Sequence, residues 1–242
     1  MNRSKIVIPR EHGGWAMLIV PYMIGMAAAK PTILHAPLFL AWLLLYFASY
    51  PLLQSLKRRR QTSEVYWGIG YAAAGAGFLI PVIWHDPWML WLAPVLLALI
   101  TVNIWHVVRR KERALLNDLC AILLFCTGGA AAYMLGGGTV GKELAVVVLV
   151  NAVYFAGTVF FVKSVFRERK NKRYSVYSRV YHLAALAVPP ILGLPWLTAA
   201  FLFPLSRSLL YSGKVIKPMK VGIIEIIGSV QFLGIGMMVL SS

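Results

Sequence analysis

The residues with the clearest chemical potential stand in one short string near the start of the chain, Arg-Glu-His-Gly-Gly-Trp-Ala at 10–16. Glu11 can pair with His12 and tune its basicity, which makes His12 the candidate for proton transfer and the two residues the candidate catalytic pair. The glycines let the backbone approach a partner closely. The string equally fits an interfacial cap in which Arg10 meets lipid head groups, and the residues leave both roles open.

Two basic clusters repeat the same order of residue types. Residues 54–60 read Gln-Ser-Leu-Lys-Arg-Arg-Arg, and residues 163–169 read Lys-Ser-Val-Phe-Arg-Glu-Arg. In both clusters, Ser is followed in order by an aliphatic residue, any residue, Arg, any residue and Arg. A duplicated four-helix unit produces such an echo, and so does chance similarity between two basic helix ends.

Polar side chains also occur inside apolar stretches, where they are costly and tend to face a cavity or a partner. Several recur at helical spacing, so each set shares one face of its helix. Interhelical hydrogen bonds and helix-start chemistry are the alternative roles. The candidates for lining a cavity are Tyr46, Tyr50, Asn103, His106, Asn117, Asp118, Asn151 and Tyr154.

Arg207 and Glu225 lie at similar depths in two consecutive apolar stretches. Pairing would relieve the cost of burying each charge. We expect a structural ion pair that clamps two helices rather than a catalytic pair.

The composition limits the class of protein that positions these residues. Of the 242 residues, 60% are hydrophobic and only 13% are charged, about half the roughly 25% of soluble domains. The strongly basic balance borders apolar stretches, so juxtamembrane positioning explains it better than nucleic-acid binding. Cys120 and Cys126 share one apolar stretch six residues apart, which favours core packing over a disulfide or metal site.

The apolar stretches predict an all-α, polytopic membrane protein with a single transmembrane domain over 1–242. The seventh and eighth of these stretches, 179–193 and 195–212, are short and broken by prolines. They form either two spans or one kinked span with a re-entrant piece. We expect helices at about 15–29, 33–55, 66–84, 87–108, 114–136, 143–163, 179–193, 195–212 and 219–240.

Charge fixes the expected orientation of these nine spans. Twenty-two of the 24 lysines and arginines fall at the N-terminus or in every second gap, and only Lys30 and Lys142 fall on the other side. The positive-inside rule therefore places the N-terminus in the cytoplasm and, with an odd number of spans, the C-terminus outside. The short gaps on the outer side leave any chemistry to the membrane or its cytoplasmic edge.

The N-terminal string at the start of a small, basic, multi-span chain resembles the YwiC-like family of bacterial integral membrane proteins, over the whole length and layout. The resemblance implies a multi-pass protein of the bacterial cytoplasmic membrane.

The layout of nine spans is also similar to the UbiA superfamily of intramembrane prenyltransferases. In that superfamily, carboxylate-rich motifs at the cytoplasmic ends of helices 2 and 6 hold magnesium against a prenyl diphosphate. The two echoing clusters stand at those positions. However, the single acidic residue in 54–64 is Glu64, and the single acidic residue in 163–179 is Glu168. Neither has the spacing of a cation clamp, so we expect no metal and no cofactor.

Arginine and lysine at these positions would repel magnesium and can hold a phosphate directly. The alternative is that these cations only obey the charge-orientation rule. The residues expected to bind an anionic head are Arg10, Gln54, Ser55, Arg58, Lys163, Ser164 and Arg167.

The sequence thus favours a UbiA-like, metal-independent protein that binds or modifies an isoprenoid or another anionic lipid in a cavity open to the cytoplasm. Membrane lipids, including a lipid phosphate, are the expected partners. A small-molecule or lipid transporter is one alternative, and a non-enzymatic assembly partner of a membrane complex is another. Neither a reaction nor a protein partner follows from the residues.

Overall fold

The computed structural model describes residues 7–9, 12–58 and 62–241. Over these ranges the chain forms helices joined by short turns, without a strand, which confirms the all-α class. The long helices are α1 (His12–Ala27), α2 (His35–Arg58), α3 (Thr62–His85), α4 (Ala93–Val108), α5 (Leu115–Leu135), α6 (Lys142–Val162), α7 (Lys172–Ala185), α9 (Ala199–Tyr211) and α10 (Pro218–Leu240). The short segments are η1 (Pro87–Leu92), η2 (Lys163–Arg167), α8 (Val188–Ile191) and η3 (Pro195–Thr198).

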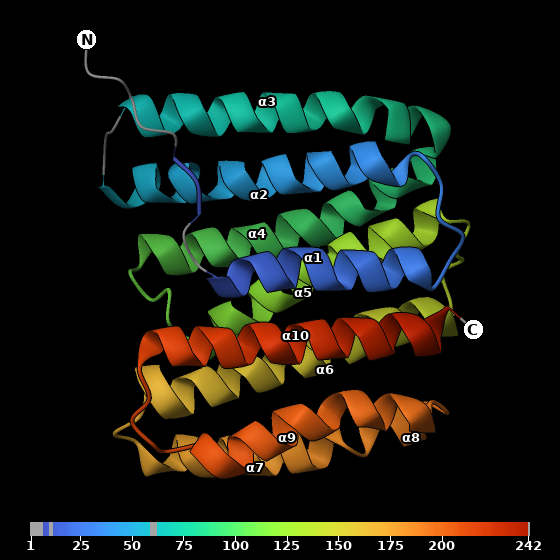
Figure 1. Ribbon diagram of the computed structural model, residues 1–242. Coiled ribbons are helices and arrows are strands. Elements are labelled where there is room, and N and C mark those ends of the chain that lie inside the picture. The colour runs from blue at the N-terminus through green and yellow to red at the C-terminus, as the bar shows by residue number, and fades with distance from the viewer. Residues whose placement is uncertain (1–6, 10–11, 59–61, 242) are drawn as a thin grey trace.

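Consecutive helices run antiparallel between two ends of the bundle (Figure 1). η1 leads into α4, η2 extends α6, α8 follows α7 and η3 leads into α9, so the described chain passes between the ends nine times. The start of α1 and the end of α10 lie at opposite ends (Figure 1).

Over the described residues, six helical segments are long and apolar enough to cross a membrane, judged by length and composition. Among the expected spans, 87–108 coincides with η1 and α4, and 219–240 matches α10 within one residue. α1 forms a shorter apolar helix of 16 residues. The six long segments are 35–57, 64–85, 87–108, 115–135, 142–167 and 218–240.

α7 begins at Lys172, seven residues before the start that its hydropathy predicts. The Asn171 side chain accepts a hydrogen bond of 3.2 Å from the backbone N–H of Arg173. This cap satisfies one of the free donors at the helix start, so the helix extends through a polar turn.

Prolines shorten the helices on either side of the turn at Gly193. α7 ends at Ala185, and α8 is a single turn that contains Pro189 and Pro190. Gly193 adopts a φ of +81°, a conformation open to glycine, and reverses the chain. Residues 179–212 therefore form two antiparallel segments, not one kinked span.

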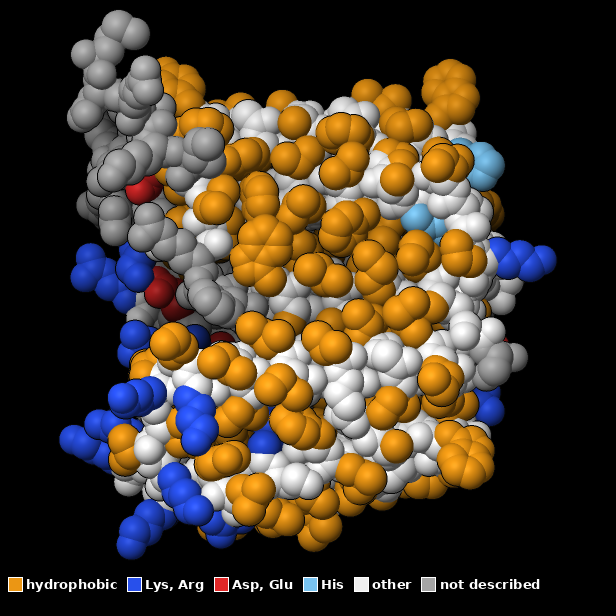
Figure 2. All heavy atoms as spheres, in the orientation of Figure 1, with side chains coloured by type: hydrophobic (Ala, Val, Ile, Leu, Met, Phe, Trp, Pro, Cys, Tyr) orange, Lys and Arg blue, Asp and Glu red, His pale blue; other side chains and the backbone are white. Residues whose placement is uncertain are grey.

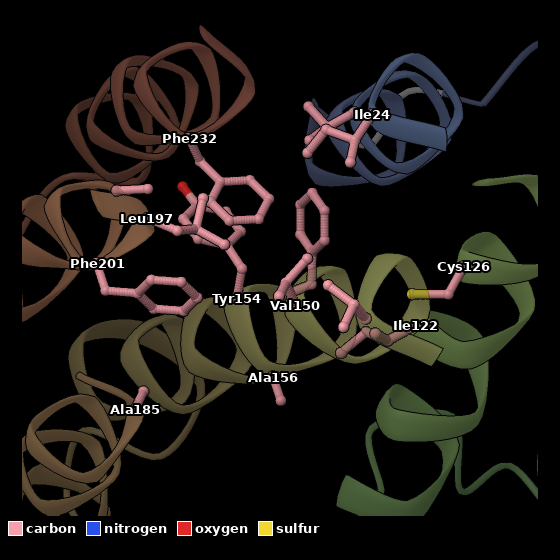
Figure 3. Close-up of a cluster of buried hydrophobic side chains, with 14 residues drawn as sticks. Ile24, Ile122, Cys126, Val150, Tyr154, Ala156, Ala185, Leu197, Phe201 and Phe232 are labelled. Atoms are coloured by element: carbon pink, nitrogen blue, oxygen red, sulfur yellow. The ribbon is translucent and has the colours of Figure 1, made fainter. Parts of the chain in front are cut away.

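The core is centred on α6, which packs against α1, α5, α9 and α10. Tyr154 stacks on Phe232 of α10, with ring centres 3.9 Å apart (Figure 3). Ile24 of α1 belongs to the same buried cluster around α6, as do Ile122 and Cys126 of α5 (Figure 3). α6 thus packs against the helices that surround it, and its C-terminal end leads into the basic segment η2.

Glycines bring α1 and α5 into backbone contact. A Cβ atom at Gly25 would overlap the carbonyl oxygen of Gly129, and one at Gly129 would press on the carbonyl of Pro21. Small residues allow such close packing between membrane helices.

Lysine and arginine side chains gather at the left-hand end of the molecule, where acidic side chains lie set back among them (Figure 2). This basic end contains the turns between α4 and α5, between η2 and α7, and between α9 and α10. Lys30 lies in the turn after α1 and Lys142 is the first residue of α6, both at the opposite end. The fold therefore separates the charges as the sequence pattern predicts.

Candidate functional site

A cavity of about 450 Å³ lies at the basic end of the bundle. Its walls come from the first turns of α1, α5 and α10, the last turns of α6 with η2, and Tyr46 of α2. The volume falls in the range of small-ligand sites. Along α10 the lining runs from Pro218 to Ser229, a rise of about 16 Å at 1.5 Å per residue. The lining along α10 therefore extends over about half the thickness of a hydrocarbon layer of about 30 Å.

Most of the wall is apolar. The apolar side chains of the wall come from α1, α5, α6 and η2, and several of them are aromatic. Among them are Met17, Phe125, Phe155, Val159, Val162 and Phe166.

One wall carries a buried cluster of charges. The Lys163 ammonium lies 2.9 Å from the Asp118 carboxylate, and only 3% of the Lys163 side chain is exposed. Lys163 also donates to the backbone carbonyl of Arg113 at 2.6 Å. Arg167 reaches Asp118 through Nη1 at 3.5 Å, and its side chain is 35% exposed. Arg167 therefore keeps most of its five N–H donors available to a ligand.

Local backbone geometry positions these two cations. The Glu168 backbone N–H donates to the Lys163 carbonyl at 2.7 Å, five residues back, so α6 ends in a π-type turn, η2. π-type turns are rare and frequently occur at functional sites.

The facing wall, on α10, carries Glu225 and Ser229 at i, i+4 spacing. Glu225 forms an ion pair with Arg207 of α9, which is almost fully buried behind it. The Arg207 guanidinium also lies over the Phe161 ring, 4.8 Å from its centre. Arg207 thus holds the Glu225 carboxylate in a fixed position at the edge of the cavity.

Two glycines at the start of α1 contribute backbone to the described part of the cavity wall. Gly13 and Gly14 line it, and a Cβ atom at Gly14 would clash with the Tyr46 hydroxyl. Arg10 and Glu11 lie outside the described residues, and the described part of His12 does not include its side chain. The side chains of the candidate catalytic pair therefore lie outside the described part of the chain.

Of the residues expected to hold an anionic head, Lys163 and Arg167 line the cavity, whereas Gln54, Ser55 and Ser164 do not. Ser55 donates to the Leu52 carbonyl of its own helix at 2.7 Å. The Arg58 side chain lies outside the described part of the chain. Among described residues, the two echoing clusters are therefore unequal: the α6 cluster faces the cavity, and α2 contributes Tyr46 instead.

Of the expected cavity-lining residues, Tyr46 and Asp118 line this cavity. The others lie elsewhere, because amides and rings turn to carbonyls of their own chain or into the core. Asn103 donates to the Leu99 carbonyl, Asn117 to the Glu112 carbonyl and Asn151 to the Val147 carbonyl, His106 contacts the Val102 carbonyl, Tyr154 stacks on Phe232, and Tyr50 is outside the lining.

A buried network of serine hydroxyls beside the cavity was not anticipated. Ser178 and Ser208 lie 2.8 Å apart, and Ser212 contacts both as well as Ser164. These serines join η2 to α7 and α9. The one sequence signal is the i, i+4 spacing of Ser208 and Ser212. Within the described ranges, no three His, Cys, Asp or Glu residues are grouped as a metal site.

The fold and site define a helical membrane protein with a charged cavity at its basic end. A family model described as "YwiC-like protein" matches residues 8–133, from just before α1 into α5. A protein of Bacillus subtilis (strain 168), described as "Uncharacterized protein YwiC", is 37% identical over 231 residues, which cover 96% of this chain and 97% of the relative. An uncharacterized protein of Haemophilus influenzae is 33% identical over 221 residues, which cover 91% and 93%.

This chain belongs to the YwiC-like family. The family match includes Asp118 and the glycines at the start of α1. No solved structure matches the chain.

Proposed function

We propose that this protein binds a lipid with an anionic head group in the cavity at its basic end. Arg167 and Lys163 hold the head, and the apolar wall of α1, α5 and α6 receives the tail. An isoprenoid phosphate or diphosphate and a phospholipid share this chemistry. The UbiA-like layout and metal-free binding belong to this same proposal.

The observation that carries the proposal is a nearly buried lysine and a partly free arginine at the mouth of an apolar cavity. Charged groups at membrane depth are costly, so they mark binding sites more often than surface charges do. Arginine supplies planar, bidentate donors that fit phosphate oxygens. Asp118 compensates Lys163 most closely, which leaves Arg167 as the principal contact for the head.

We further propose that the basic end faces the cytoplasm of a bacterial cell, across the cytoplasmic membrane. The supporting observation is the separation of lysines and arginines between the two ends of the bundle, which follows the positive-inside rule. The cavity then opens toward the leaflet from which a cytoplasmic lipid intermediate or an inner-leaflet phospholipid would enter.

The test is retention of dioleoyl phosphatidic acid, measured by native mass spectrometry of protein purified in mild detergent. Arg167→Gln should weaken retention by roughly tenfold or more, as expected for the loss of a charge-assisted hydrogen bond of about 1.5–3 kcal/mol. Arg169→Gln is the matched control, because Arg169 is an exposed cation of the same turn outside this cavity.

Lys163→Gln should weaken retention as well, although it also removes the main partner of Asp118. Equal retention by the wild type, Arg167→Gln and Arg169→Gln would reject the cavity as the site. Absence of any retained anionic lipid in the wild type would reject the function.

A further inference from the structure

The cavity has a negative wall as well as a positive one. Glu225 and Ser229 of α10 line the same cavity as Arg167 and Lys163 of η2. Within the described residues, four ionisable side chains line the cavity, and Asp118 is the fourth. A ligand in the cavity therefore meets two carboxylates as well as two cations.

The two carboxylates are held differently. Asp118 contacts both cations of its own wall, at 2.9 and 3.5 Å. Glu225 is held from behind by Arg207 through one oxygen, Oε1. The Glu225 side chain remains 16% exposed, toward the cavity that it lines. Glu225 is therefore anchored as a carboxylate and can still accept a hydrogen bond from a ligand.

Resting on the proposed function, we propose that the preferred head group is zwitterionic and carries a primary ammonium together with its phosphate, as phosphatidylethanolamine does. The phosphate meets Arg167, and the ammonium donates to Glu225 and Ser229. Both charges of the head then face the opposite charge. A head group with phosphate alone offers no further donor to Glu225, whose Oε1 already accepts from Arg207.

The hydrogen-bonding character of this wall distinguishes a primary from a quaternary ammonium. A carboxylate and a hydroxyl accept N–H hydrogen bonds, which a primary ammonium supplies and a quaternary ammonium lacks. Aromatic rings also line the cavity, among them Phe125 and Phe155, and rings of this kind attract quaternary ammonium groups. A choline head is therefore the informative competitor.

The experiment compares three dioleoyl lipids, phosphatidylethanolamine, phosphatidic acid and phosphatidylcholine, by competition on the full-length protein in native mass spectrometry. The wild type should retain phosphatidylethanolamine about tenfold better than either of the others. Glu225→Gln should abolish this preference while phosphatidic acid still binds through Arg167. Glu112→Gln is the matched control, since Glu112 is a carboxylate of the basic end that pairs with Lys57 outside the cavity.

Ser229→Ala provides a second variant that leaves the Arg207–Glu225 pair intact, and it should lower the same preference. Retention of phosphatidic acid without any preference for phosphatidylethanolamine in the wild type would overturn this inference and leave the proposed function standing. A wild-type preference for phosphatidylcholine would assign the cavity to aromatic recognition of choline instead. Loss of all three lipids from the wild type would overturn both.

Discussion

At the scale of single residues, the Arg207–Glu225 pair is the most constrained feature of the site. The Arg207 side chain is 1% exposed, and its Nε and Nη2 atoms have no hydrogen-bond partner among the described residues. Glu225 is therefore the main compensation for a charge removed from water and lipid head groups alike. Breaking a buried pair from one side costs more than removing both charges, because the remaining charge stays desolvated.

Glu225→Met should destabilise the fold by about 3–5 kcal/mol, since it leaves the Arg207 cation alone in the bundle. The double variant Arg207→Met with Glu225→Met should recover most of that loss. Unfolding by increasing fractions of dodecyl sulfate in mixed micelles measures both. A double variant no more stable than the single one would show that the pair contributes through packing rather than charge.

Other residue-scale features of the cavity have no counterpart in the linear sequence. Asp118 and Lys163 stand on different helices, and neither neighbourhood indicates that they meet. Asn103 and His106 share one helical face and read as a cavity wall, yet each turns to a carbonyl of its own helix. Polar spacing predicts which residues share a face. It does not predict whether the face meets a cavity or only its own backbone.

At the scale of elements, the close contact of α1 and α5 positions two walls of the cavity. Gly129→Ala should destabilise the protein by about 1–3 kcal/mol, because the added methyl meets the α1 backbone, which cannot move aside cheaply. Gly77→Ala on α3 is the matched control. No heavy atom lies within 4 Å of its added Cβ, and alanine favours a helix.

Dodecyl sulfate unfolding of the two variants checks this prediction. Gly77→Ala should be neutral or slightly stabilising. If Gly129→Ala unfolds with the wild type, the two helices have room that the structure does not show.

The helices were predictable from the sequence where the length of an apolar stretch determines them. The long apolar stretches became helices with boundaries within a few residues, because a membrane span must satisfy its backbone internally. The failures cluster between 172 and 198. There, the cap at Asn171 extends α7 into polar sequence and prolines divide the following turns. Local caps and breaks override average hydropathy at such places.

At the scale of the whole molecule, the separation of charge predicts a fixed orientation. In a Cys120→Ala, Cys126→Ala background, a cysteine replacing Lys142 should react with a membrane-impermeant maleimide added to intact cells. A cysteine replacing Lys170 should react only after the membrane is opened, because the positive-inside rule, applied to the 22 of 24 basic residues on its side of the sequence pattern, assigns that side to the cytoplasm. Labelling of both from outside, or the reverse pattern, would contradict the orientation.

The shortness of α1 has a consequence for the surrounding bilayer. Its 16 residues rise about 24 Å, several ångströms less than the roughly 30 Å hydrocarbon layer that they must match. Lipids beside a short span adapt by local thinning. We therefore expect the leaflet to thin next to the wall where Gly13 and Gly14 border the cavity, which would bring the polar surface of the membrane closer to the charged groups. For the proposed lipid, such thinning would shorten the path of the head group to the cavity compared with a full-length span.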